Sequence, residues 1–126
     1  KTYTPSVHNE MDEISYTTWD AIHRGNRMVV ENLSSFDDFE RIEVAGKTGT
    51  AQQVKTRPNH ALFVGYAPYN DPKVSITTRI AYGYTSHNAA DVSANILKYY
   101  FRLDTADNLI TGKAANVGNN SNSFTD

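Results

Sequence analysis

The sequence predicts an α+β fold: a three-stranded antiparallel meander with an N-terminal and a C-terminal helix on one face. Two segments with helical periodicity flank the middle of the chain. Between them lie three apolar or alternating runs joined by short turns, a pattern that favours antiparallel neighbours. The 126 residues suffice for one domain with its own core.

Composition excludes several classes of function. The formal net charge is −2 and no basic stripe is present, which argues against a nucleic-acid partner. The absence of cysteine excludes disulfides, thiolate metal sites and cysteine nucleophiles. No apolar run reaches the length of about 18 residues that would span a membrane. We expect no metal and no cofactor.

The first helix is predicted from residue 17 onward. Residues 1–16 have no hydrophobic period and are interpreted as a connecting segment, and the chain looks like a piece of something larger. Thr17 offers a capping hydroxyl with Asp20 three residues later. The apolar stripe then comprises Trp19, Ile22, His23, Val29, Val30 and Leu33.

Two residues of this helix need an interpretation. His23 lies on the apolar stripe, so we predict a packed residue and not a catalytic base. Gly25 costs a helix about 1 kcal/mol relative to alanine. We therefore expect it to pack closely against a neighbouring element.

Three strands follow. The first is predicted over 41–54. The second, 62–67, is nearly continuous in apolar character, which is typical of a strand buried on both faces in the middle of a sheet. The third starts at Lys73 and alternates apolar with polar side chains, as a half-buried strand does.

The second helix is predicted from a cap at 88–91, and its expected inner stripe comprises Val92, Ile96, Tyr99 and Leu103, widened by Leu97, Tyr100 and Phe101. Residues 17–103 would form the folded α/β part. Residues 104–126 are rich in Asn, Ser, Gly, Ala and Asp, so we expect a flexible tail.

The strip Lys47–Thr50 is the chemically most informative part of the chain. In a strand, Thr48 and Thr50 share one face, and Gly49 leaves the backbone bare for close approach of a ligand or strand. With the charge of Lys47, the strip could hold a carboxylate while its N–H groups pair with an extended peptide. A plain surface strand would also use these residues. A phosphate loop is excluded, because Arg41 stands where that motif needs glycine.

Longer strings around this strip carry a family resemblance. Residues 44–52 (Val-Ala-Gly-Lys-Thr-Gly-Thr-Ala-Gln) resemble the third active-site motif, the Lys-Thr-Gly box, of penicillin-binding proteins. Residues 60–68 (His-Ala-Leu-Phe-Val-Gly-Tyr-Ala-Pro) look like the strand that follows this box in class B enzymes. Residues 18–30 look like the helix that precedes it. The resemblance implies the C-terminal part of a penicillin-binding-protein/β-lactamase-like transpeptidase domain.

The resemblance also implies roles in the site. Lys47 would be the catalytic residue of this chain and would hold a Ser-x-Asn hydroxyl in place. Thr48 and Thr50 would bind the carboxylate of a substrate or β-lactam, and the Thr50 N–H would complete an oxyanion hole. Gly49 would let the donor peptide lie along the strand.

The nucleophile that the family uses is missing. No serine stands three residues before any lysine, so the Ser-x-x-Lys motif is absent. Ser-x-Asn occurs at 86–88 and 93–95, after the Lys-Thr-Gly box, whereas the family places it before. We interpret both matches as coincidental. The chain alone is therefore expected to be inactive.

The function implied for the parent protein is D,D-transpeptidation of peptidoglycan. An acyl-enzyme would form at a D-Ala-D-Ala stem peptide, at the extracytoplasmic face of a bacterial membrane, with the parent anchored by a single span. Expected partners are the stem peptide, β-lactam antibiotics and the missing N-terminal part of the same domain. Alternatives are a β-lactam-sensing receptor domain, a serine β-lactamase, and a small interaction domain with a fortuitous motif. A role in division, elongation or sporulation stays open.

An isolated sheet segment has open edges. We therefore expect a folded but marginal unit that associates with itself through an exposed strand edge or apolar surface. A single monomeric species in sedimentation at all concentrations would contradict this.

Overall fold

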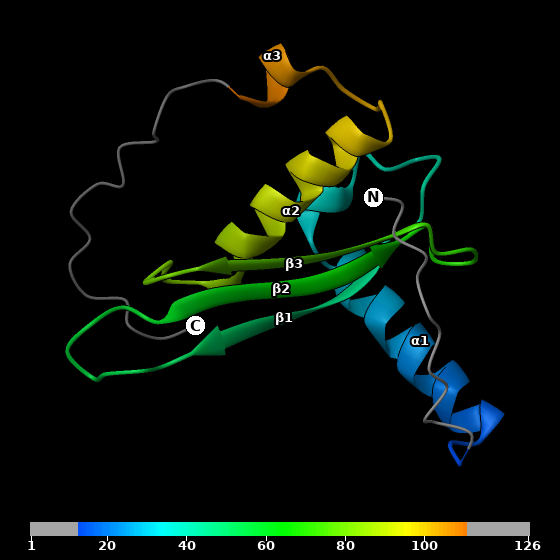
Figure 1. Cartoon of the computed structure of the whole chain (residues 1–126), viewed down its shortest axis with the longest axis horizontal. Helices are drawn as coiled ribbons and strands as arrows, with labels where there is room; N and C mark the ends of the chain where they lie inside the picture. The colour runs from blue at the N-terminus through cyan, green and yellow to red at the C-terminus, as the bar shows by residue number, and fades with distance from the viewer. Residues whose placement is uncertain (1–12, 111–126) are drawn as a thin grey trace, which may run out of the picture.

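A computed structural model describes residues 13–110 and shows a small sheet with helices packed against it (Figure 1). The predictions for residues 1–12 and 111–126, including most of the expected tail, lie outside this range. The elements in chain order are α1 (Tyr16–Glu31), the 3-10 turn η1 (Ser34–Phe36), β1 (Ala45–Ala51), β2 (His60–Ala67), β3 (Val74–Ile80), α2 (Ser86–Tyr100) and α3 (Ala106–Leu109).

The sheet is the predicted antiparallel meander, in the order β1-β2-β3. The β1–β2 ladder runs from the pair Ala45–Tyr66 to the pair Ala51–His60. The β2–β3 ladder runs from Ala61–Ile80 to Ala67–Val74. Within the described part of the chain, β1 and β3 are therefore the two edges.

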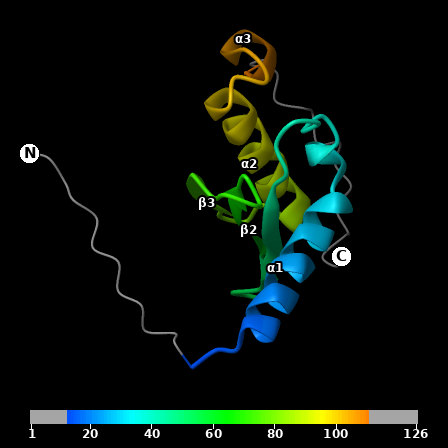
Figure 2. The same cartoon turned by 90° about the vertical axis from the view of Figure 1, so that its right-hand side faces the viewer.

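The helices have different relations to the sheet. Helix α2 packs across all three strands, whereas α1 packs mainly against β1 and reaches β2 through the contact of His23 with Tyr66. Figure 2 shows both helices on the same side of the strands, with α1 displaced toward β1. This confirms the predicted fold class. No helix within residues 13–110 is long and apolar enough to cross a membrane.

The buried face of α2 differs from the prediction. The expected stripe is wrong at four positions, because Val92, Ile96, Tyr99 and Tyr100 are 41%, 51%, 62% and 56% exposed. The residues buried against the sheet are mainly small: Ser86, Ala89, Ala90, Ser93, Ala94 and Leu97. The reason is steric. Phe63 of β2 belongs to the same core cluster and fills the layer below α2, so a helix lying close to the sheet must present small side chains there.

The core continues from α2 to the end of α1. Phe63 is fully buried and its ring stacks on that of Phe36, with 5.5 Å between centroids. Val30 and Leu33 close the cluster from the α1 side. The predicted contact of Gly25 is wrong, since nothing lies within 4 Å of a Cβ built there.

Several element boundaries and one strand environment also differ. Helix α2 begins at Ser86 with Thr85 as its N-cap, before the predicted cap at 88–91. Helix α1 begins at Tyr16, because the Ser15 side chain accepts the N–H of Thr18 as its N-cap. Strand β1 is shorter than the predicted 41–54. One face of β2 is buried throughout, whereas the other is buried unevenly: His60 is 7% exposed and Val64 is 52% exposed. On that second face Tyr66 contacts His23 of α1, but Val64 remains open, so the apolar sequence did not imply full burial on both sides.

Candidate active-site strand

Burial changes abruptly along β1. Ala45 and Gly46 are buried, Thr48 and Gly49 are half-buried, and Lys47 and Thr50 are exposed. Figure 1 shows why: α1 lies beside the start of β1 and away from its arrowhead. The Lys-Thr-Gly strip therefore lies where the edge strand emerges from the core.

Gly46 is required by packing inside the chain. A Cβ at this position would lie 2.6 Å from Cζ of Phe63 and 2.7 Å from the carbonyl oxygen of Val64. The same constraint applies to its cross-strand partner Gly65, where a Cβ would lie 2.7 Å from Cε1 of Phe63. The paired glycines form the slot that holds the Phe63 ring, and this packing sets β1 against β2 just before the strip begins.

Gly49 is different. A Cβ there would lie 3.4 Å from Cβ and 3.6 Å from Cδ1 of Leu62, which are ordinary van der Waals distances. The described neighbours therefore leave room for a methyl group at Gly49. What glycine adds here is an uncovered backbone beside the open edge of the sheet.

The two hydroxyls lie on one face, as the alternation of a strand predicts. Thr48 pairs with Phe63 and Thr50 with Ala61, and both partners point to the face that α2 covers. Lys47 and Gly49 belong to the opposite face. An extended ligand along the edge of β1 could thus meet hydroxyls from one side and the ammonium group from the other.

Lys47 extends along its own strand. Its Nζ donates a hydrogen bond to the carbonyl oxygen of Thr48, at 2.8 Å. No carboxylate within residues 13–110 forms an ion pair with it. The ammonium group is therefore available to a ligand or to another polar group brought to the edge.

Both Ser-x-Asn matches lie within α2, where their polar groups have partners in the same part of the chain. Ser93 is fully buried, with Oγ 2.7 Å from Oγ1 of Thr78 and 2.8 Å from the carbonyl oxygen of Ala89. Ser86 is the first residue of α2 and is also buried. Asn88 donates its side-chain N–H to the carbonyl oxygen of Gly83, at 2.8 Å. Neither serine is exposed, as an attacking nucleophile would need to be.

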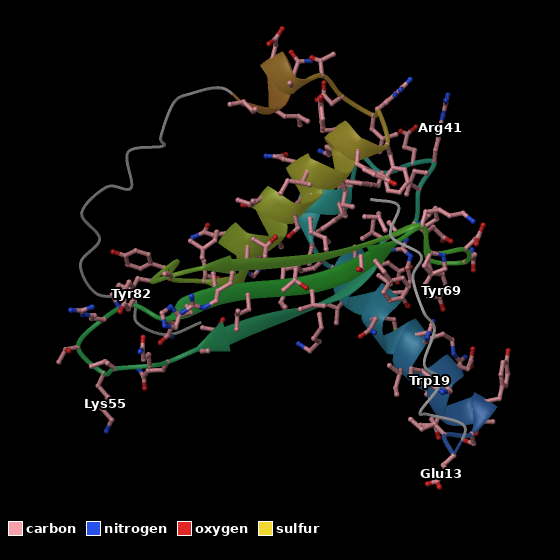
Figure 3. The ribbon with its side chains drawn as sticks, in the orientation of Figure 1. Glu13, Trp19, Arg41, Lys55, Tyr69 and Tyr82 are labelled. Atoms are coloured by element: carbon pink, nitrogen blue, oxygen red, sulfur yellow. The ribbon has the colours of Figure 1, made fainter. Side chains whose placement is uncertain are left out.

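His23 is a packed residue, as predicted. Its Nδ1 lies 3.2 Å from the hydroxyl of Tyr66, and its ring meets the edge of Trp19. Burial raises the pKa of Tyr66, and the neighbouring Tyr69 adds to the effect. Figure 3 shows Trp19 and Tyr69 on the same side of the molecule, at the end of the sheet where β1 begins.

His60 is a residue that the sequence analysis did not single out. It opens β2, is only 7% exposed, and has a hydrogen-bond partner at each ring nitrogen. The available signal was a histidine at the start of an otherwise apolar strand. Its partners, Gln53 and Tyr82, come from two different connections, and no periodicity in the sequence could have identified them.

Comparisons with known proteins agree with this architecture. Residues 3–101 match the family described as the penicillin binding protein transpeptidase domain. Peptidoglycan D,D-transpeptidase MrdA of Haemophilus influenzae is 30% identical over 116 residues, covering 76% of this chain and 18% of that protein.

Solved structures give the same result. The D,D-transpeptidase domain of a peptidoglycan glycosyltransferase from Eggerthella lenta matches with a TM-score of 0.63 and 30% identity, over 81% of this chain and 24% of that one. Penicillin-binding protein A of M. tuberculosis, in its imipenem acyl-enzyme complex, matches with a TM-score of 0.62 over 70% of this chain and 20% of that one. At 22% identity this second likeness shows the fold alone. The chain spans about a fifth of the length of these relatives.

Proposed function

Because the chain belongs to the penicillin-binding protein transpeptidase domain family, as part of a class B domain, we propose that it forms one wall of the active site of a serine D,D-transpeptidase. It would be the C-terminal part of that domain. The substrate would be a peptidoglycan stem peptide that ends in D-Ala-D-Ala, and a β-lactam would take the same place.

Lys47 and the two threonines have distinct roles in this proposal. The Lys47 ammonium group would hold the hydroxyl of a Ser-x-Asn motif from the rest of the domain, since no carboxylate within residues 13–110 neutralises it. Thr48 and Thr50 would bind the terminal carboxylate of the substrate through their hydroxyls. The Thr50 N–H would donate to the oxygen that becomes negative in the tetrahedral intermediate.

The attacking serine would come from polypeptide outside these 126 residues. Its Oγ would add to the carbonyl carbon of the penultimate D-Ala and pass its proton to a base. The C–N bond to the terminal D-Ala would then break, and D-Ala would leave with a proton on its amine. An amine of a neighbouring stem would attack the resulting ester, form the cross-link and release the serine. The present chain would orient the substrate in each step.

The observation that carries this proposal is the space at Gly49. Gly46 is explained by Phe63, whereas nothing among the described neighbours requires glycine three residues later. A ligand backbone lying along β1 would require it, and Lys47 and Thr50 on either side supply the polar groups that such a ligand needs. The location of the parent at the extracytoplasmic face of a bacterial membrane, with a single membrane anchor, belongs to the same proposal.

Intact-mass measurement after incubation with a labelled penicillin tests the proposal. We expect no covalent adduct on the isolated chain. The complete protein that contains this chain should gain the mass of one penicillin, on a serine outside residues 1–126. An adduct on the isolated chain, or none on the complete protein, would refute the assignment.

A further inference from the structure

The Lys47–Thr50 strip lies next to the end of the β1–β2 ladder. The last pair is Ala51 with His60, one residue after Thr50. Residues 52–57 then leave the sheet as an exposed connection. Ladder ends open easily when few contacts hold them. The position of Thr50 therefore depends on what ties this connection to the body of the protein.

His60 provides such a tie. Its Nε2 lies 2.9 Å from Oε1 of Gln53, and its Nδ1 accepts the backbone N–H of Tyr82 at 3.1 Å. Because Nδ1 accepts, the ring proton belongs on Nε2, where it is donated to Gln53. One neutral tautomer thus satisfies both bonds, and the buried ring joins the β1–β2 connection to the β3–α2 turn.

Tyr82 is the second half of this tie. Its backbone is left-handed, with φ of 55°, a conformation that residues other than glycine rarely adopt. The bond from its N–H to His60 helps to hold that conformation. Its hydroxyl accepts from a guanidinium N–H of Arg57 at 2.9 Å, and the guanidinium also lies over the ring.

The two side chains that anchor the β1–β2 connection, Gln53 and Arg57, therefore bind to neighbouring rings. Gln53 is bound to His60, Arg57 is bound to Tyr82, and the two rings are in contact with 4.9 Å between centroids. Figure 3 shows Tyr82 and Lys55 of the connection at the same end of the sheet, where β1 ends.

We propose that His60 is a positioning residue for the Lys47–Thr50 strip: it locks the last ladder pairs through Gln53 and Tyr82 and so keeps Thr50 in register. It does not touch substrate. The catalytic consequence rests on the function proposed above, whereas the mechanical consequence is testable on this chain alone.

Amide hydrogen exchange on this chain tests the mechanical part. Gln53 is exposed, so Gln53→Ala removes one bond of the tie without disturbing the core. We expect about fivefold to tenfold faster exchange at the amides of residues 50–53, as the loss of one hydrogen bond permits. Thr56→Ala, an exposed change in the same connection, is the matched control and should leave these amides unchanged. Equal exchange in wild type and Gln53→Ala would overturn the proposal.

The tautomer gives a second, independent readout. Long-range proton–nitrogen NMR spectra should show His60 with a bare Nδ1 and a protonated Nε2. If Nδ1 carried the proton, its N–H would face the backbone N–H of Tyr82 and the hydrogen bond between them could not form. That result would also overturn the proposal.

The catalytic part is tested in the complete protein with a labelled penicillin. His60→Ala should slow acylation about tenfold, an effect of misplaced groups and not of lost chemistry. His60→Gln, whose amide N–H can reach Gln53 in place of Nε2, should recover part of the rate. Gln53→Ala should slow acylation as well and serves if His60→Ala fails to fold. Unchanged acylation rates in these variants would overturn the positioning role. If the wild-type complete protein gained no penicillin adduct, the proposed function would be refuted, but the hydrogen-exchange result would remain valid.

Discussion

The two ends of β1 lie in opposite environments, one buried and one exposed. Gly46 lies against the Phe63 ring and Ala45 is buried on the opposite face beside Tyr66, whereas Lys47 to Ala51 emerge along an open edge. Each half contains one glycine. Gly46 makes room for the chain's own Phe63 ring, whereas Gly49 leaves room for a group from outside the chain.

This difference teaches how to interpret glycine in a strand. Gly46 and Gly49 look alike in the sequence, and only the contacts of a Cβ built at each separate them. A glycine that its own fold requires is structural, and one that its own fold does not require points to a partner outside the chain. Anchoring one end of β1 in the core gives the exposed end a fixed starting point.

The largest effect should come from the exposed half. Lys47→Ala in the complete protein should lower the rate of acylation by a labelled penicillin about 10²–10³-fold, the usual loss when one preorganised electrostatic group is removed from a site. Stability should change by less than about 0.5 kcal/mol, because the side chain is exposed. Lys73→Ala is the matched control, since Lys73 is also exposed and its ion pair within residues 13–110 is a local one with Asp71. Equal rates for the two variants would contradict the proposed role of Lys47.

The next effect belongs to the buried half. Gly46→Ala should lower the free energy of unfolding by about 1–3 kcal/mol, because the new methyl group overlaps the Phe63 ring. Urea unfolding of the isolated chain measures the loss.

Gly49→Ala is the control for that experiment and sharpens the comparison. Stability should stay within about 0.5 kcal/mol of wild type, since the methyl group meets Leu62 at ordinary distances. Acylation of the complete protein should nevertheless fall about tenfold, because the methyl group displaces the ligand backbone. If Gly46→Ala and Gly49→Ala destabilise the chain equally, the distinction between the two halves fails.

The smallest effect concerns Tyr66, whose strand partner is Ala45 in the buried half. Burial raises the pKa of Tyr66 above its ordinary 10.0, so the folded state resists ionisation. The contribution to stability is complete below pH 10 and is lost as the pH rises through the folded-state pKa. Tyr66→Phe should therefore show a shallower fall in the urea midpoint between pH 9 and pH 11. Other tyrosines ionise in both proteins, so parallel pH profiles would contradict the prediction.

Much of the architecture could be predicted from local pattern. Three strand-like runs joined by short turns allow little besides a meander, and the alternation of β3 directly indicated a half-buried strand. The face of α2 could not be predicted in this way. Its large apolar residues suggested one stripe, and the tertiary structure buried the alanines, because Phe63 already fills the space above β2.

The candidate site divides in the same manner. By itself, the sequence determined that Lys47, Thr48, Gly49 and Thr50 form a strand segment with both hydroxyls on one face, because side chains alternate along any strand. Only the tertiary structure decided that this segment emerges from the core at Lys47, that Gly46 and Gly49 have different reasons to be glycine, and that His60 ties the far end. Those facts depend on contacts between residues far apart in the chain, and no local pattern encodes such contacts.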